Sequence, residues 1–160
     1  MVTVIALPQT LPGFTAALYR APSRIALGNK GEELLAYALQ QQGYSVRIDH
    51  QYQSGDLTVF DANGHSVRLE IKTARKAKDK RYHFTLRKHW QGRQCADHTG
   101  ADFVVLICVA RTGHPSIFVV PVDALNVNSC TIGDPSTYSG RFARYRQNIR
   151  ELRLNYGNHG

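Results

Sequence analysis

Two strand-like runs on either side of a tight turn constrain the fold of this chain more than any other feature. Residues 56–60 and 67–72 alternate between apolar and polar side chains, as half-buried strands do. The segment Asp61-Ala62-Asn63-Gly64 lies between them, and Asn-Gly between such runs is a strong hairpin signal. The sequence therefore predicts an antiparallel hairpin with one apolar face and one polar face.

The length of the loop decides which residues of the two strands face each other. A three-residue loop at 62–64, with its glycine in the left-handed conformation, places Asp56 opposite Glu70 with Cβ atoms roughly 5 Å apart. A two-residue turn at 63–64 would instead place Asp56 opposite Ile71 and scatter the charged side chains. We favour the three-residue loop, because it also pairs the apolar residues of the two strands with each other.

Asp56, Glu70 and Lys72 are the residues around which we expect the chemistry of this protein. Strand periodicity places Glu70 and Lys72 on one face, about 7 Å apart. Two carboxylates held as close as Asp56 and Glu70 repel each other, and they persist together mainly when a cation lies between them. Mg²⁺, with Mn²⁺ as a substitute, takes oxygen ligands and suits a site that handles phosphate. Lys72 would supply a positive charge to the scissile phosphate or the attacking water, so the sequence predicts metal-assisted phosphodiester hydrolysis.

A helix predicted at 29–42 contributes a third carboxylate. Asn29 is its candidate N-cap, and Gly43 stands where glycine ends many helices. Glu32 lies near the edge of the apolar stripe and can face a neighbouring sheet, whereas Glu33 points to solvent. We therefore expect Glu32 to be a catalytic residue and a ligand of the metal or of its water.

Plainer interpretations of these acids stay open. A glutamate in the first turns of a helix also suits the helix dipole. Alternating Glu and Lys on a strand also occur on solvated faces with cross-strand pairs. The hairpin register, the helical glutamate and the basic segment that follows together favour a functional site.

The rest of the pattern predicts a mixed α/β domain. Further strands are predicted at 44–48, 83–86, 101–110 and 117–120, and the run at 101–110 is so apolar that it predicts a central strand covered on both faces. We expect a loop at 126–137 and a helix with several arginines at 140–154. The domain organisation is then an N-terminal arm or extension at 1–27, followed by a single domain at 28–160 with a basic C-terminal helix.

The charge balance favours a polyanionic partner. The chain has 20 Lys plus Arg against 12 Asp plus Glu, which gives a formal net charge of +8. Each phosphate that such a protein neutralises releases counterions. We expect DNA phosphates to be contacted by the cations that follow the proposed site, namely Arg75, Lys76, Lys78, Lys80, Arg81, Arg87 and Lys88. The alternative for this cluster is a solvated loop.

Several features bear on location. No stretch approaches the ~20 apolar residues needed to cross a bilayer, so we expect no membrane association. The three cysteines are widely spaced, which is not typical of a disulfide framework. The first residues lack the basic region of a secretory signal. We therefore expect an intracellular, cytoplasmic protein.

A family resemblance is carried by Gly55-Asp56, by Glu70-Ile71-Lys72 and by the upstream helix with Glu32. These residues resemble the PD-(D/E)XK nuclease superfamily, and the resemblance covers roughly 28–125. The spacing from Glu32 to Gly43-Tyr44 is similar to that of archaeal-type Holliday-junction resolvases. The strands downstream look closer to small intron-encoded homing endonucleases. The one departure is a glycine, in place of proline, before Asp56.

The resemblance implies a restriction-endonuclease-like core, with a central mixed β-sheet flanked by helices. It further implies that Asp56 and Glu70 are metal ligands, the Ile71 carbonyl a further ligand, Lys72 catalytic and Glu32 auxiliary. Members of the superfamily often act as homodimers or higher oligomers, so we expect a homo-oligomer.

These observations lead to three functional hypotheses. The first is a Mg²⁺-dependent endodeoxyribonuclease of the homing or restriction type. The second is a structure-selective Holliday-junction resolvase. The third is a non-catalytic nucleic-acid-binding module with a vestigial site, which would bind DNA in a salt-sensitive way without cleaving it.

Overall fold

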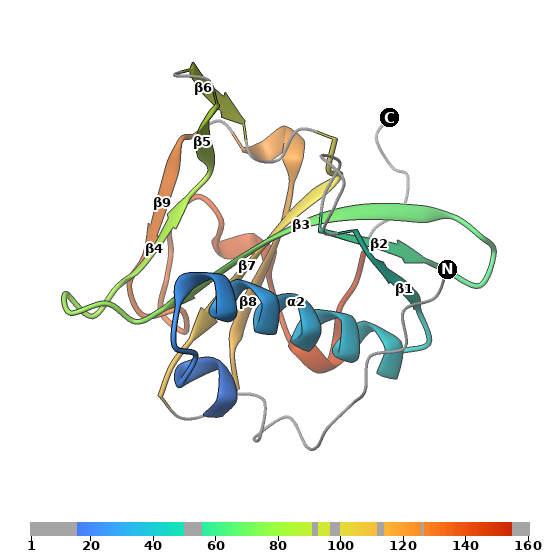
Figure 1. Cartoon of the computed structure of the whole chain (residues 1–160), viewed down its shortest axis with the longest axis horizontal. Coiled ribbons are helices and arrows are strands. Elements are labelled where there is room, and N and C mark those ends of the chain that lie inside the picture. The colour runs from blue at the N-terminus through green and yellow to red at the C-terminus, as the bar shows by residue number, and fades with distance from the viewer. Residues whose placement is uncertain are drawn as a thin grey trace.

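A mixed six-stranded sheet forms the centre of the molecule (Figure 1). The computed structural model describes residues 16–49, 56–90, 93–96, 100–111, 114–125 and 127–154, with the backbone alone for 87–90 and 93–96. The strand order is β1-β2-β3-β7-β8-β10. The strands are β1 (Ser45–Ile48), β2 (Leu57–Phe60), β3 (Ser66–Arg75), β7 (Phe103–Val109), β8 (Ser116–Pro121) and β10 (Arg146–Gln147). Among the described strands of this sheet, β3 and β7 are parallel and the other neighbouring pairs are antiparallel, so the sheet is mixed, as predicted.

The long helix α2 (Arg24–Gln41) packs on one face of this sheet. The predicted start at Asn29 is wrong, because Ser23 is the N-cap and its Oγ accepts a hydrogen bond from the Ala26 N–H at 3.1 Å. Leu27, in the first turn, is buried in the core, so tertiary packing holds the extra residues in helical form. The packing of Leu18 and Ala21 in the same core also joins the end of the expected arm to the domain.

The end of α2 agrees with the prediction. Gly43 has φ +92° and its N–H donates to the Gln40 carbonyl at 3.0 Å, while the Tyr44 N–H donates to the Leu39 carbonyl at 3.1 Å. These two bonds define a Schellman motif, in which glycine takes a backbone conformation that other residues avoid. None of the described helices is long and apolar enough to cross a membrane.

A second, two-stranded sheet covers part of the opposite face. It pairs β4 (Tyr82–Thr85) with β9 (Ser129–Ile132), and its buried residues pack on those of β7 and β8. Every residue of β7 is buried between the two cores, which confirms the predicted central strand. The loop expected at 126–137 is wrong where it contains β9, because Cys130 and Ile132 gain burial only by pairing with the distant β4.

The connection between the parallel strands β3 and β7 contains strands and loops, and no helix, in its described part. It contains β4 and the antiparallel pair β5 (Arg87–Trp90) and β6 (Arg93–Ala96). Such crossovers more often carry a helix.

The predicted C-terminal helix at 140–154 is wrong. The segment contains two 3₁₀ turns (Ala143–Tyr145 and Ile149–Glu151) on either side of β10, which pairs with β8. Phe142 is buried in the core under β4 and β9, whereas Ile149, Leu152 and Leu154 are buried in the core under α2. The segment therefore passes around the edge of the sheet from one face to the other. A straight helix could not reach both cores, although the apolar spacing resembles that of a helix.

Candidate active site

The hairpin of β2 and β3 has the register that the three-residue loop predicts. Leu57 pairs with Leu69 and Val59 with Val67. Gly64 has φ +82°, and its N–H donates to the Asp61 carbonyl at 3.2 Å. The turn therefore requires a residue that accepts the left-handed conformation, and the alternative two-residue turn is excluded.

Asp56 lies where β2 separates from β3. The ladder of the two strands ends at the pair Leu57–Leu69, while β3 continues to Arg75. The Asp56 N–H still donates to the Leu69 carbonyl at 2.8 Å, and Asp56 Oδ2 accepts from the Ile71 N–H at 2.8 Å. The Asp56 carboxylate thus accepts the hydrogen bond that a backbone carbonyl would accept if β2 continued beside β3. This bond holds the Asp56 charge against β3, next to Glu70.

The backbone carbonyl of Ile71 points to the same edge of β3 as its N–H. In an extended strand the two groups of one residue lie on the same side, and the Ile71 N–H is directed at Asp56. The Ile71 carbonyl therefore faces the Asp56 side of β3, where the metal-ligand role implied for it requires it to be.

Glu70 and Lys72 share the face of the sheet that is turned away from α2. Val67, Leu69 and Ile71 are in the core under α2, so the residues between them have the opposite orientation. Lys72 Nζ lies 3.5 Å from Glu70 Oε1, and the two side chains are 23% and 15% exposed. A half-buried ammonium therefore stands beside the carboxylates, with enough exposure to meet a substrate.

Gly31 brings α2 close to β3 next to the site. A Cβ atom at this position would overlap Thr73 Oγ1, so only glycine permits the observed approach. Thr73 follows Lys72 directly in β3, so this contact lies next to the Glu70–Lys72 pair along the strand. Because Glu32 follows Gly31, this contact fixes how closely Glu32 approaches β3, on the face of the sheet that α2 covers.

Glu32 is buried and faces the sheet, as predicted. Its pKa is raised from 4.5 to about 8, mainly because burial disfavours the charged form and further because the charges of Asp56, Glu70 and Glu33 repel it. Asp56 directly precedes β2, Glu70 lies in β3, and Glu33 lies on the helix itself. The acids predicted from distant parts of the sequence are therefore brought into electrostatic contact.

The donor set of this site fits a hard divalent cation. Carboxylate oxygens and a backbone carbonyl are the ligands that Mg²⁺ accepts, and the repulsion that raises the Glu32 pKa is what a cation would relieve. Within the described ranges, no three His, Cys, Asp or Glu side chains converge closely enough to enclose a metal by themselves. Mg²⁺ usually binds through one or two carboxylates, and water and substrate phosphate complete its coordination shell. A site in which Asp56 and Glu70 are the main protein ligands is consistent with this preference.

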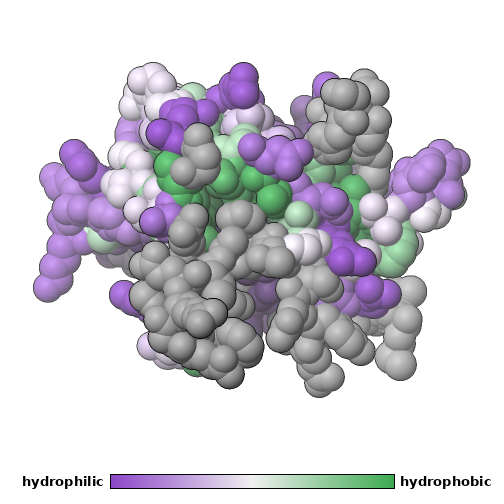
Figure 2. Space-filling view, turned by 90° about the horizontal axis from the view of Figure 1, so that it is seen from above, coloured by the Kyte–Doolittle hydropathy of each residue, from purple (hydrophilic) through white to green (hydrophobic). Residues whose placement is uncertain are grey.

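The basic segment after β3 forms a second tight loop. The Ala77 N–H donates to the Arg81 carbonyl at 2.8 Å, and the Lys80 N–H donates to the Ala77 carbonyl at 2.9 Å. Lys80 has φ +64°, the conformation that Gly64 takes in the other hairpin. Lys76, Lys78, Lys80 and Arg81 are all exposed on this loop. Figure 2 shows hydrophilic residues gathered on the lobe at its left edge, where Figure 1 places the β3–β4 loop.

The remaining predicted DNA contacts differ in their surroundings. The Arg75 guanidinium is half-buried, and its Nη1 donates to the carbonyls of Tyr19 and Ala21 at 3.0 and 2.8 Å. Arg75 therefore ties the segment before α2 to the end of β3. Arg87 and Lys88 lie in β5, and their side chains are outside the described part of the chain.

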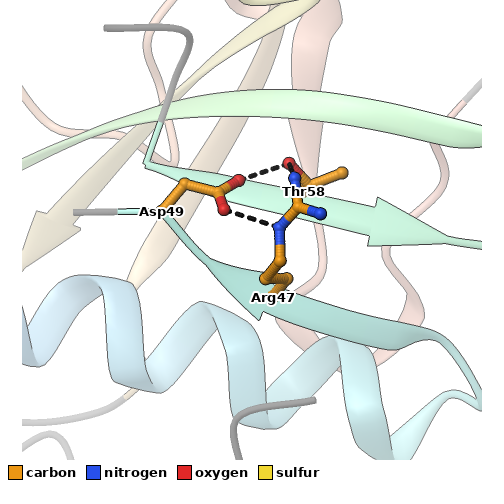
Figure 3. A network of polar contacts seen from close by, with 3 residues as sticks. All are labelled: Arg47, Asp49 and Thr58. Carbon is orange, nitrogen blue, oxygen red and sulfur yellow. Dashed lines mark hydrogen bonds and ion pairs between the residues drawn. The ribbon is translucent and has the colours of Figure 1, made fainter. Parts of the chain in front are cut away.

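One polar cluster beside the site was not predicted from the sequence. Asp49 and Thr58 are buried, and both contact Arg47 on the face that carries Glu70 (Figure 3). The signal was available, because Arg47 and Asp49 alternate with the apolar Val46 and Ile48 as Glu70 and Lys72 do with their neighbours.

Comparison with known proteins supports the fold. No protein-family model matches the chain, and no curated protein matches it in sequence. Among solved structures the chain is similar to a bacterial homing endonuclease, I-Ssp6803I, with a TM-score of 0.59 and 17% sequence identity over 74% of this chain and 85% of that chain. Likeness at this identity establishes a shared fold, and it confirms the predicted α/β class with a large mixed sheet.

Proposed function

We propose that this chain is a Mg²⁺-dependent endodeoxyribonuclease of the homing type, built on the PD-(D/E)XK pattern. The observation that carries the proposal is the carboxylate of Asp56, which leaves strand pairing to accept the Ile71 N–H beside Glu70 and Lys72. The similar fold of a homing endonuclease supports DNA as the substrate. The excess of cations, with a net charge of +8, agrees with a polyanionic partner.

The proposed roles follow from position. Asp56 and Glu70 would hold the ion, with the Ile71 carbonyl as a further ligand and Glu32 as an auxiliary one. When bound, Mg²⁺ supplies an acidified water molecule and neutralises charge that develops on phosphorus. Lys72, held beside Glu70, would donate to a non-bridging phosphate oxygen. Glu32 keeps a proton on its carboxyl group up to about pH 8 in the metal-free chain, which limits the repulsion among the acids.

The loop at 77–81 would hold DNA at a distance from the cut. Lys76 follows Glu70 by six residues, which corresponds to roughly 20 Å along an extended strand. Backbone phosphates of one DNA strand advance about 3.4 Å per base pair along the helix axis, so this loop would contact phosphates about six base pairs from the scissile bond. A homo-oligomer, which we also propose, would bring a second site to the other strand.

Replacing Lys80 by Gly is expected to stabilise the protein and to weaken its DNA binding. Glycine accepts φ +64° without the Cβ penalty, which is worth on the order of 1 kcal/mol. The lost charge should reduce the slope of log K against log salt concentration by about one, similarly for all DNA sequences. Denaturant unfolding and binding titrations at several salt concentrations measure the two effects.

The matched control for this variant is Lys78→Gln, which removes a charge from the same loop at a residue without positive φ. It should weaken DNA binding to a similar degree and leave stability unchanged. If Lys80→Gly binds DNA as tightly as the wild type does, the loop does not contact phosphates.

The proposed activity is tested with purified protein and three DNAs, namely supercoiled plasmid, linear duplex and a four-way junction. We expect cleavage of plasmid and duplex with Mg²⁺ or Mn²⁺ and none with EDTA. Strong preference for the junction over linear duplex of the same sequence would instead favour the resolvase. Salt-sensitive binding without cleavage in either metal would favour the non-catalytic module and contradict the proposal.

A further inference from the structure

The carboxylate of Asp49 joins strands β1 and β2 (Figure 3). Val46 and Ile48 pack in the core under α2, so the alternating Arg47 and Asp49 lie on the opposite face of the sheet. Asp49 Oδ1 accepts from Arg47 Nε at 2.7 Å, and Asp49 Oδ2 accepts a short hydrogen bond from the Thr58 hydroxyl. Arg47 Nη2 donates to Thr58 Oγ1 at 3.3 Å, which closes the cluster. Asp49 is 5% exposed and Thr58 4% exposed, so a charge is held out of water with its partners in place.

This cluster is directly connected to Asp56. The Asp49 N–H donates to the Asp56 carbonyl at 2.8 Å, and the Asp56 N–H donates to the Leu69 carbonyl at 2.8 Å. The Asp56 backbone is therefore held between Asp49 on one side and β3 on the other. In both ladders of β2, the last regular pair at this end involves Leu57. The two backbone bonds and the bond of the Asp56 carboxylate therefore extend the pairing by one residue, to Asp56.

The cluster of Arg47, Asp49 and Thr58 fixes local geometry more than it contributes to the folding stability of the protein. An ion pair between a buried carboxylate and a guanidinium that is 45% exposed contributes little net stability, because water screens the attraction and desolvation of the carboxylate offsets it. A buried carboxylate that accepts from two partners does, however, select one geometry, since a shift would take it away from them. The geometry selected here is that of the strand end which carries Asp56.

We propose that Asp49, held by Arg47 and Thr58, is a positioning residue that sets Asp56 against the Ile71 N–H for catalysis. This inference rests on the proposed nuclease function and deepens it. Asp49 does not touch the substrate in this scheme, and its effect passes through the Asp56 backbone. Outer groups of this kind typically change metal affinity or activity by about 10–100-fold when they are removed.

The test compares Asp49→Asn with Asp61→Asn. Asp61 also receives several hydrogen bonds, from the Asn63 N–H at 2.8 Å, the His65 N–H at 2.9 Å and the His65 ring at 3.1 Å, but it lies at the far end of the same hairpin. Asp49→Asn should lower kcat about 10–100-fold with KM for DNA within about twofold of wild type. Asp61→Asn should leave both constants unchanged.

Two further measurements separate positioning from loss of structure. The Ile71 amide, which is bonded to the Asp56 carboxylate, should exchange its hydrogen faster in Asp49→Asn, while amides of the central β7 keep wild-type protection. Thr58→Ser, which keeps the hydroxyl, should retain activity, whereas Thr58→Val should show the Asp49→Asn loss of kcat.

Specific results would overturn the inference. An unchanged kcat in Asp49→Asn, or faster exchange throughout β7 together with the loss of activity, would show that the cluster does not position Asp56. If the wild type itself fails to cleave DNA with Mg²⁺, the proposed function is wrong. In that case the hydrogen-exchange rate of the Ile71 amide alone tests the positioning role of Asp49. An exchange rate in Asp49→Asn equal to that of the wild type overturns this role.

Discussion

Replacing Asp56 by Asn is expected to slow Mg²⁺-dependent DNA cleavage by about 10²–10³-fold. The substitution keeps the size of the side chain, and its carbonyl oxygen can still accept from the Ile71 N–H. What disappears is the negative charge that the proposed metal site would use, together with Glu70, to hold a divalent ion. In EDTA the variant should bind DNA more tightly than the wild type does, because one fewer negative charge faces a polyanion.

The chain offers a matched control for this substitution. Asp102 Oδ2 accepts from the Arg68 N–H at 2.8 Å, just as Asp56 Oδ2 accepts from the Ile71 N–H at 2.8 Å on the same strand. Asp102→Asn should therefore cleave at the wild-type rate under single-turnover conditions. Equal rates for the wild type and Asp56→Asn would mean that any activity comes from another site or from a contaminant.

Replacing Glu32 by Gln is expected to remove a strong pH dependence of stability. The Glu32 pKa is about 8 in the folded chain and 4.5 as a model value, so the folded state keeps a proton that the unfolded state has lost between these pH values. Stability of the metal-free wild type should fall as pH rises through this window, by on the order of a few kcal/mol. Glu32→Gln carries no such group, so it should match the wild type near pH 4 and exceed it near pH 9.

Denaturant unfolding of both proteins across this pH range, with and without Mg²⁺, measures the effect. Added Mg²⁺ should stabilise the wild type most at high pH, where three ionised carboxylates repel one another, and should stabilise Glu32→Gln less. Parallel pH profiles of the two proteins in EDTA would mean that Glu32 is not buried beside Asp56 and Glu70.

Elements that depend on neighbours along the chain could be predicted from the sequence. The hairpin register followed from a three-residue loop with glycine in the left-handed position, and Gly64 has φ +82°. The end of α2 followed from Gly43, and the central strand β7 from its continuous apolar run. For the hairpin and the helix end, the deciding interactions lie within a few residues or a single strand pair. For β7, the continuous apolar run itself indicates a strand that is covered on both faces.

Elements that depend on distant contacts could not be predicted in this way. The early start of α2, the strand β9 and the course of residues 140–154 are each decided by burial against remote parts of the chain. The C-terminal segment is the clearest case, because its helical spacing of apolar residues arises from contacts with two separate cores.

The residues of the candidate site fall into the same two groups, those placed by local structure and those placed by distant contacts. Asp56, Glu70 and Lys72 could be assigned from one hairpin, because a strand and its tight turn determine which side chains are neighbours. The approach of Glu32 needed the close packing of Gly31 against Thr73, and the Asp49 cluster needed the pairing of β1 with β2. These contacts form only when β1 pairs with β2 and when α2 packs on the sheet, since Thr58 is not a neighbour of Asp49 along the chain, nor Asp56 of Glu32.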